Sequence, residues 1–198
     1  LHYVENSRQM QDGDLLLIDA GAEYGGYCAD ITRTFPVGRR FSEPQRQLYQ
    51  LVLEAQAAAI DAVRPDVPFD APHQRATDVL VDGLIGLGLL SGPHEQAIES
   101  GAYRNFFMHR TSHWLGMDVH DVGVYRVGAQ ARLLAPGIVL TIEPGLYVAP
   151  DCETVEPAWR GIGIRIEDDV LVTPAGARVL SAAVPKAIAD IEALRQAL

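Results

Sequence analysis

The chain has 198 residues, of which 48% are hydrophobic and 21% are charged, a composition typical of one soluble globular domain with a substantial core. No apolar run approaches the roughly 18 residues of a membrane span, and the formal net charge of −10 argues against nucleic acid or an anionic membrane as a partner. Cys28 and Cys152 are the only cysteines, too few for a disulfide scaffold, so a reduced, cytoplasmic setting is expected.

Two strands joined by a tight turn are predicted near the start of the chain. Residues 14–20 (DLLLIDA) form a short apolar run typical of a buried strand, and residues 27–35 (YCADITRTF) are rich in β-branched and aromatic residues. Residues 23–26 (EYGG), between them, have the composition of a hairpin turn. We therefore expect an antiparallel hairpin.

Two helices should follow this hairpin. Ser42 is a candidate N-cap, and Gln45, three residues later, completes a capping box. Pro65 ends the periodic pattern of the first helix. The apolar stripe of that helix consists of Leu48, Leu51, Val52, Ala55, Ala59, Ala62 and Val63. A second helix is predicted from Asp70 to about Leu90.

The second half of the chain reads mostly as strands. Residues 106–109, 138–143 and 162–172 are predicted strands, and a final helix is expected from Pro185. Strands, then two helices, then mostly strands is the order of an α+β protein built around an antiparallel sheet, rather than of regular βαβ alternation.

A weak internal echo links the two halves. Residues 18–21 (IDAG) resemble residues 142–145 (IEPG), and a second acidic strand position follows in each half, at Asp30 and at Glu167. Four positions are a weak repeat signal, but two related halves that face a shared site would produce this pattern.

The predicted first hairpin brings two acidic residues close together. If the turn centres on Tyr24-Gly25, Asp19 lies directly opposite Asp30, with Cβ atoms about 5 Å apart. Like charges in that arrangement are destabilising unless a positive charge lies between them, and a bound cation would supply it. A different register, or a turn-capping role for one aspartate, is an equally good interpretation.

Two glutamates lie at the ends of apolar strands. Glu143 follows the run Ile138–Ile142, where a lone carboxylate costs several kcal/mol unless it is paired. Strand alternation places Arg165 and Glu167 on one face, where they form a structural salt bridge or line one cavity. The parallel direction of such neighbours favours the cavity.

The histidines cluster, since His109, His113 and His120 fall within twelve positions. Zinc held by histidine alone is one interpretation of that cluster. Four carboxylates with one imidazole are instead an oxygen-dominated set that suits manganese, cobalt or magnesium. Two divalent ions would balance four carboxylates, whereas one ion would leave a large negative charge.

Four motifs closely resemble the catalytic domain of bacterial Xaa-Pro aminopeptidase (aminopeptidase P), a peptidase family with the pita-bread fold. The resemblance implies a curved antiparallel sheet with helices packed on the outside and two pseudo-symmetric halves. The motifs are residues 18–41 (IDAGAEYGGYCADITRTFPVGRRF), 113–123 (HWLGMDVHDVG), 141–150 (TIEPGLYVAP) and 161–173 (GIGIRIEDDVLVT).

The resemblance also implies a ligand set for two divalent ions. Asp19 would hold one ion, His113 and Glu143 the other, and Asp30 and Glu167 would bridge both. Manganese is the expected metal, with cobalt, magnesium or zinc as alternatives.

Roles for five residues follow from the same resemblance. Glu143 matches the position that shuttles a proton from the nucleophilic water to the leaving amine. His120 and His2 match positions that contact the substrate and the developing oxyanion. His109 and Arg165 match residues that line the pocket for the proline after the cut bond.

The expected activity is hydrolysis of the bond between an N-terminal residue and a penultimate proline in a peptide. Residues 1–198 are expected to be a metallopeptidase catalytic domain that lacks an upstream domain, and a dimer or tetramer is the expected assembly. A prolidase acting on Xaa-Pro dipeptides is the nearest alternative. A non-catalytic binding protein on the same fold is the alternative from another class, and methionine aminopeptidase fits the motifs less well.

Overall fold

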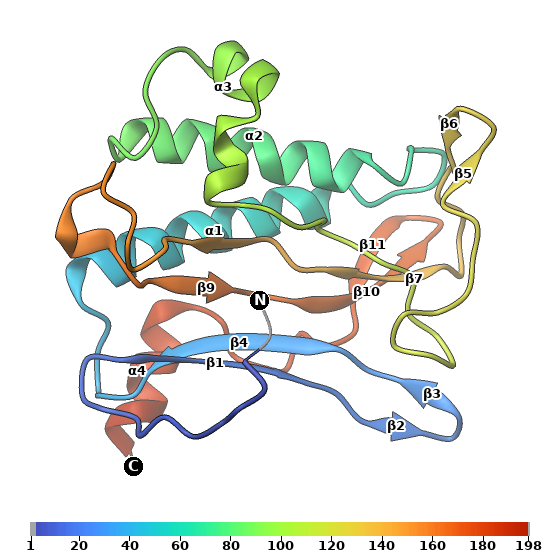
Figure 1. The fold of residues 1–198 in the computed structure, drawn as a ribbon. Coiled ribbons are helices and arrows are strands. Elements are labelled where there is room, and N and C mark those ends of the chain that lie inside the picture. The colour runs from blue at the N-terminus through green and yellow to red at the C-terminus, as the bar shows by residue number, and fades with distance from the viewer. Residues whose placement is uncertain (1–2, 198) are drawn as a thin grey trace.

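A computed structural model describes residues 3–197 as short antiparallel strand pairs stacked beneath two long helices (Figure 1). Every strand pairing among these residues is antiparallel, and helices separate the strands of the first half from those of the second. The α+β architecture expected from the sequence is therefore confirmed.

The strands form small sheets rather than one continuous ladder. The first half contains β1 (Leu15–Ala20) paired with β4 (Ile31–Pro36), and β2 (Glu23–Tyr24) paired with β3 (Tyr27–Cys28) at the tip of the same hairpin. The second half contains a three-stranded sheet with the strand order β11 (Gly176–Val179), β10 (Asp168–Thr173), β7 (Val139–Ile142). It also contains two separate pairs. One is β8 (Gly145–Tyr147) with β9 (Gly163–Arg165), and the other is the hairpin of β5 (Arg126–Val127) and β6 (Gln130–Ala131).

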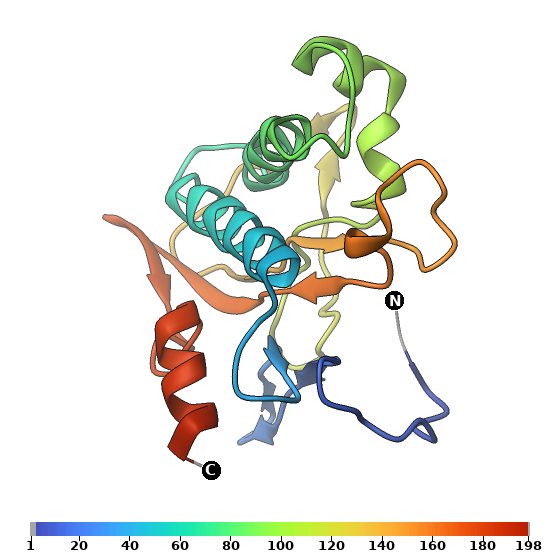
Figure 2. The ribbon, with the colours of Figure 1, turned by 90° about the vertical axis from the view of Figure 1, so that its left-hand side faces the viewer.

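Two long helices cover the second-half strands on one side. Helix α1 contacts β7, β8 and β9, and α2 packs on α1; Figure 2 shows α2 nearly end-on, with α1 running obliquely between it and the strands. The helices are α1 (Glu43–Asp61), α2 (Ala71–Gly86), α3 (His94–Ser100) and α4 (Ile188–Ala197), with short 3-10 turns η1 (Ala102–Asn105) and η2 (Pro157–Trp159). No helix in residues 3–197 is long and apolar enough to cross a membrane.

The capping and periodicity predicted for α1 are confirmed. The backbone N–H of Ser42 donates to Gln45 Oε1 at 2.9 Å, which begins the helix at Glu43. The core side of the helix is formed by the buried side chains of Leu48, Leu51, Val52, Ala55 and Ala59. The helix ends at Asp61, so the last two predicted stripe residues, Ala62 and Val63, lie beyond it and ahead of Pro65. The period of 3.6 residues therefore identified the buried face correctly.

The register predicted for the first hairpin is wrong by one position at the turn. Tyr24 pairs with Tyr27, so that Gly25 and Gly26 form the turn, with φ of 61° and 83°. Two adjacent residues with positive φ match the twist of the flanking strands, and glycine adopts this conformation at no steric cost. Asp19 consequently lies opposite Thr32, and Asp30 becomes its diagonal neighbour on the same face.

The strand predicted at residues 106–109 is also wrong. This segment follows η1 as a loop, and its one backbone hydrogen bond to a strand in the described structure is accepted by the Phe106 carbonyl from the Tyr147 N–H. Phe106 and Phe107 are both buried, at 3% and 1% exposure, although adjacent side chains of a strand point to opposite faces. Two consecutive buried aromatic rings are packed here without a β-ladder.

The remaining differences concern boundaries. The predicted strand at 162–172 is interrupted at Ile166 and Glu167, which separates β9 from β10. Helix α2 ends at Gly86 rather than near Leu90, because Gly88 turns the backbone to a φ of 73°. The final helix begins at Ile188. Helix α3 lies outside the predicted elements.

Close packing of α1 on α2 depends on one glycine. A Cβ at Gly83 would lie 2.2 Å from Leu51 Cδ1, whereas a Cβ at Gly86, one turn further along α2, has no neighbour within 4 Å. We expect Gly83→Ala to lower the free energy of unfolding by about 1–3 kcal/mol through overpacking. Gly86→Ala, the matched control, should be neutral or stabilising by up to about 1 kcal/mol, because alanine favours a helix. Chemical denaturation measures both, and equal effects would contradict the packing assigned to Gly83.

Candidate metal centre

Five predicted side chains come together in one cleft of about 550 Å³. They are contributed by both halves of the chain, at or next to strand ends. Asp19 lies in β1, Asp30 directly precedes β4, Glu143 directly follows β7 and Glu167 directly precedes β10. His113 lies in a segment beside β7, where its carbonyl accepts the Thr141 N–H at 3.0 Å.

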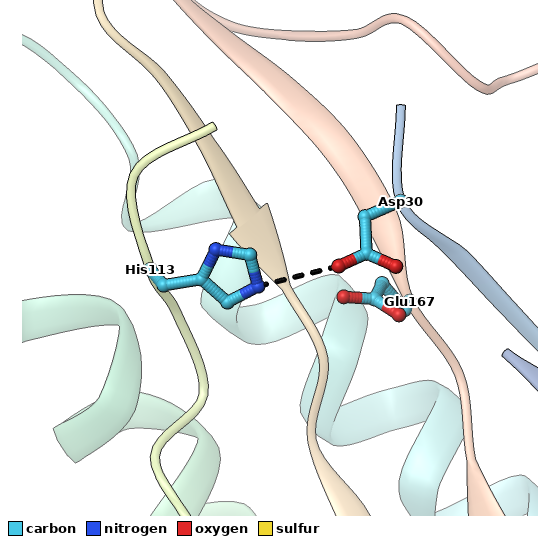
Figure 3. Close-up of side chains that lie close together, drawn as sticks. All are labelled: Asp30, His113 and Glu167. Atoms are coloured by element: carbon cyan, nitrogen blue, oxygen red, sulfur yellow. Dashed lines mark ion pairs between the residues drawn. The ribbon is translucent and has the colours of Figure 1, made fainter. Parts of the chain in front are cut away.

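Asp30, His113 and Glu167 form the tightest group of this cleft (Figure 3). One ligand atom from each lies within 4.8 Å of the other two. His113 Nε2 is 3.4 Å from Asp30 Oδ2 and 3.5 Å from Glu143 Oε1. A single cation could therefore contact carboxylates from both halves and the imidazole.

The imidazole is held in the orientation that a ligand needs. His113 Nδ1 lies 3.0 Å from the Trp114 carbonyl oxygen, which accepts an N–H from that nitrogen. In the neutral ring, the lone pair of Nε2 then points at the carboxylates of Asp30 and Glu143. Burial alone would lower the pKa of His113, but the hydrogen bond to Asp30 and neighbouring charges raise it to about 9.

The two glutamates have strongly perturbed carboxyl groups. Burial, followed by the charges of Glu143 and Asp30, raises the pKa of Glu167 to about 9. Burial raises the pKa of Glu143 to about 7. Without a cation between them, these carboxylates disfavour one another's charged forms.

Asp19 is at the edge of the group and has a second partner. Arg165 Nη2 donates to Asp19 Oδ2 at 2.7 Å and Arg165 Nη1 donates to the Tyr147 hydroxyl at 3.0 Å. Burial and the adjacent Asp30 carboxyl raise the pKa of Asp19, whereas hydrogen bonds from His113 and Asp19 outweigh burial and lower that of Asp30. The two aspartate side chains are therefore in contact, as predicted. They meet as diagonal neighbours on adjacent strands and not as the directly opposed pair that the predicted register required.

The donor set fits a divalent metal. Four carboxylates and one imidazole offer mostly hard oxygen ligands, and a cation would stabilise the charged forms of the two glutamates, whose pKa values are raised chiefly by burial. Lysine or arginine could do the same, but Arg165 contacts only the Asp19 end of the group. The Asp30–His113–Glu167 group has no such cation among the described ion pairs.

The other predicted histidines have different positions. The His120 ring stands edge-on to His113, with centroids 4.4 Å apart, and both line the cleft. His109 Nε2 lies 2.9 Å from the Tyr147 hydroxyl and Nδ1 lies 2.8 Å from the Arg110 carbonyl oxygen. His2 lies outside the described residues.

Three supporting residues were missed from the sequence. The Thr32 hydroxyl donates to Glu167 Oε2 at 2.6 Å, the Thr141 hydroxyl donates to Glu143 Oε1 at 3.3 Å, and the Asp169 carboxylate accepts the Asp30 N–H at 3.3 Å. Thr32, Thr141 and Asp169 each lie two positions from a predicted ligand. The period of two of a strand could therefore have identified them.

The opposite wall of the cleft was also missed. It includes Phe69 and Tyr125, whose rings are 4.9 Å apart, and Asp70, which contacts both Arg110 and Arg126. These residues come from the α1–α2 connection, from the loop that contains Arg110, and from the start of the β5–β6 hairpin, so no local pattern predicts their meeting. The cleft is therefore acidic on one side and carries two guanidinium groups on the other.

The chain matches metallopeptidase family M24 over residues 1–174 and therefore belongs to that family, whose membership implies a divalent metal. It is 52% identical to the Xaa-Pro aminopeptidase of Escherichia coli (strain K12) over 194 residues, 98% of this chain and 44% of that protein. The corresponding protein of Haemophilus influenzae is 50% identical over 98% of this chain and 45% of its own length.

Solved structures of related aminopeptidases have the same fold as this chain. Pseudomonas aeruginosa aminopeptidase PepP superposes with a TM-score of 0.98 and 54% identity, covering 100% of this chain and 45% of that one. Proline aminopeptidase P II from Yersinia pestis superposes with a TM-score of 0.96 and 52% identity over 100% of this chain and 45% of its own. The expected pita-bread fold is confirmed. The chain spans less than half the length of these relatives.

A buried histidine behind the cleft predicts a pH dependence of stability. His73 Nδ1 lies 2.8 Å from the hydroxyl of the fully buried Thr111, whose carbonyl accepts the Glu143 N–H at 2.8 Å. Burial, helped by the charge of Arg110, lowers the pKa of His73 to about 4. The unfolded chain therefore binds this proton more readily, and the associated stability is present above pH 6.5 and lost as the pH falls toward 4.

Between pH 8 and pH 5, this group should lower the free energy of unfolding of the metal-free protein by about 2 kcal/mol. In His73→Gln that part of the pH dependence should be absent, as urea titrations at both pH values would measure. His94→Gln is the control with the opposite sign, because a hydrogen bond to Asp82 raises the pKa of the exposed His94. An unchanged pH dependence in His73→Gln would contradict the assignment.

Proposed function

We propose that this chain is the catalytic domain of a metallopeptidase that removes the N-terminal residue from peptides with proline in second position. The observation that carries the proposal is the convergence of Asp19, Asp30, His113, Glu143 and Glu167 from both halves of the chain on one cleft. Similarity to proteins named Xaa-Pro aminopeptidase, over nearly the whole of this chain, supports the substrate class.

The proposed ligands divide between two ions. Asp19 would hold one, His113 and Glu143 the other, and Asp30 and Glu167 would bridge them. The ligand atoms of Asp30, His113 and Glu167 lie within 4.8 Å of one another, which supports the shared position. Manganese, cobalt, magnesium or zinc fit such donors, and we favour manganese because the set is dominated by carboxylates. Bound there, the ions would supply an activated water and an electrophile for the scissile carbonyl.

Glu143 is the proposed proton carrier. Its carboxyl oxygens lie 3.5 Å from His113 Nε2 and 3.8 Å from His109 Nδ1, between the proposed ligands and the proposed proline pocket, where a group could take a proton from the attacking water and return it to the leaving nitrogen. Its Oε1 is held by the Thr141 hydroxyl at 3.3 Å, which orients the carboxyl group. Proton delivery matters because the leaving group is the prolyl nitrogen, a poor leaving group as an anion.

Two groups of side chains would orient the peptide. His120, beside His113, is placed to donate to the scissile carbonyl as negative charge develops on its oxygen. The rings of Phe107, His109 and Tyr147 stack edge-on in sequence, with centroids 5.1 and 5.5 Å apart. Arg165 donates to the Tyr147 hydroxyl and helps to hold this row of rings, and we assign its cleft-lining member, His109, to the proline. His2 remains a proposed substrate contact from the sequence.

The acidic groups of the cleft explain why a free amino terminus would be required. A peptide ammonium group is attracted by the carboxylates, whereas a chain passing through would place an uncharged amide there.

A prolidase, which accepts only Xaa-Pro dipeptides, is the second candidate. The two exposed guanidinium groups of Arg110 and Arg126 favour it to the extent that they bind the carboxylate of a dipeptide. A cytoplasmic location and a homo-oligomer are parts of the same proposal.

Manganese titration and peptide hydrolysis test this function together. We expect two ions per chain and faster hydrolysis of an Ala-Pro-Ala tripeptide than of an Ala-Pro dipeptide. Asp30→Asn should lose manganese and at least 1,000-fold in kcat/KM, because it removes a charge shared by both ions. Asp61→Asn, an exposed change at the end of α1, is the control and should match the wild type.

Two results would contradict the proposal. Binding of less than one manganese per chain together with no hydrolysis of either peptide would favour a non-catalytic binding protein. A preference for the dipeptide would assign the protein to the prolidases instead. Wild-type turnover in Asp30→Asn would refute the ligand assignment.

A further inference from the structure

The two parts of the metal centre are carried by strands that do not pair with each other. Asp30 leads into β4, which pairs with β1, whereas Glu167 lies between β9 and β10, which pair with β8, β7 and β11. Strand β4 nevertheless contacts both β9 and β10. One backbone hydrogen bond joins them in the described chain, from the Glu167 N–H to the Thr32 carbonyl at 3.1 Å. We call this junction the seam.

Side chains close the seam in place of a β-ladder. The Thr34 hydroxyl donates to the Arg165 carbonyl at 2.9 Å and accepts the Arg165 N–H at 3.2 Å. The Thr32 hydroxyl donates to Glu167 Oε2 at 2.6 Å. These contacts lie on the face of β4 that looks toward the cleft. Arg33, between the two threonines, projects from the other face.

Arg33 holds both edges of the seam with one nitrogen. Its Nη1 donates to the Thr32 carbonyl at 2.9 Å and to the Glu167 carbonyl at 2.6 Å. The first carbonyl belongs to the residue two positions after Asp30, and the second belongs to a proposed bridging ligand. The distance between the two backbone segments is therefore set by a shared donor.

The same guanidinium is anchored from behind by three other groups. Arg33 Nη2 donates to Asp168 Oδ1 at 2.8 Å and to the Val184 carbonyl at 2.9 Å, and Nε donates to the Pro185 carbonyl at 3.1 Å. Arg33 thus makes five hydrogen bonds while only 8% exposed. Asp168, with no exposed surface, is held in turn by Ser181 and Lys186. All the donor nitrogens of Arg33 are engaged, so the group cannot shift without losing buried hydrogen bonds.

We propose that Arg33 is a positioning residue that sets the separation of Asp30 from Glu167, and so determines whether two ions can share these carboxylates. It contacts neither ligand oxygens nor the cleft, and it acts through the two carbonyls that it joins. The proposal rests on the ligand roles proposed above. A lysine in its place would keep the charge but has no planar fork that reaches acceptors on three segments at once.

The position explains why arginine is buried here despite the cost of desolvating its charge. Asp168 compensates that charge, and four backbone carbonyls take the remaining donors. Lys186 Nζ also contacts Asp168, at 2.6 Å, but no hydrogen bond joins it to Thr32 or Glu167 in the described structure. Lys186 therefore offers a matched control, since it shares the Asp168 cluster and not the seam.

The test compares Arg33→Lys with Lys186→Met in the protein loaded with manganese. Titration calorimetry should show that Arg33→Lys weakens binding of the second manganese 10- to 100-fold, with the first affected less. The electron paramagnetic resonance signal of two exchange-coupled manganese ions should disappear at ion concentrations that saturate the wild type. Lys186→Met should keep both affinities and the coupled signal, although both variants lose stability to heat.

Three outcomes would overturn the proposal. The first is unchanged affinity and coupling in Arg33→Lys, and the second is an equal loss in both variants, which would assign the effect to the Asp168 cluster. The third is an Arg33→Lys protein that stays unfolded with manganese present, since Arg33 would then serve overall stability rather than position. Failure of the proposed function is separate, because it would appear as a wild-type protein that binds less than one ion.

Discussion

The structure depends on keeping like charges close together in a partly buried cleft. Asp19, Asp30, Glu143 and Glu167 come from both halves of the chain, and among the described ion pairs only Asp19 has an arginine partner, Arg165 at 2.7 Å. Thr32, Thr141 and Asp169 orient individual carboxylates or their backbone, and α1 supports the strands from behind. A divalent metal explains this arrangement, because it converts the repulsion into attraction.

The arrangement of groups in the cleft also agrees with the proposed reaction. Its acidic side would receive an amino terminus and metal ions, and His109, which lines the cleft and is held between the rings of Tyr147 and the buried Phe107, would offer a rigid surface for a proline ring. Glu143 lies between these parts, within 3.8 Å of His109 and 3.5 Å of His113. A group that carries a proton from water to the prolyl nitrogen has to occupy such a middle position.

Local patterns in the sequence predicted more of the fold than of the site. The stripe of α1 and its Ser42 cap were predictable because a helix depends on residues three and four apart. The hairpin register failed because the choice between Tyr24-Gly25 and Gly25-Gly26 depends on which two residues take positive φ. The five proposed ligands were recognised as a set by resemblance; physical arguments pointed to Asp19 with Asp30, to Glu143 and to Glu167, but none of them selected His113 among three histidines. Arg33 could not be predicted, since its partners at 167, 168, 184 and 185 lie far along the chain.

The most direct test of the charge constraint is the stability of Glu167→Gln without metal, measured by urea denaturation at pH 7.5 in chelator. The amide oxygen of the variant can still accept the Thr32 hydroxyl, and the amide needs no proton on folding at pH 7.5, whereas the Glu167 carboxyl, with its pKa raised to about 9, must take one up. The variant should be more stable than the metal-free wild type and should gain less from added manganese, while the exposed Glu153→Gln should behave as wild type. A metal-free Glu167→Gln protein less stable than the wild type would contradict the idea that these carboxylates are held together against their repulsion.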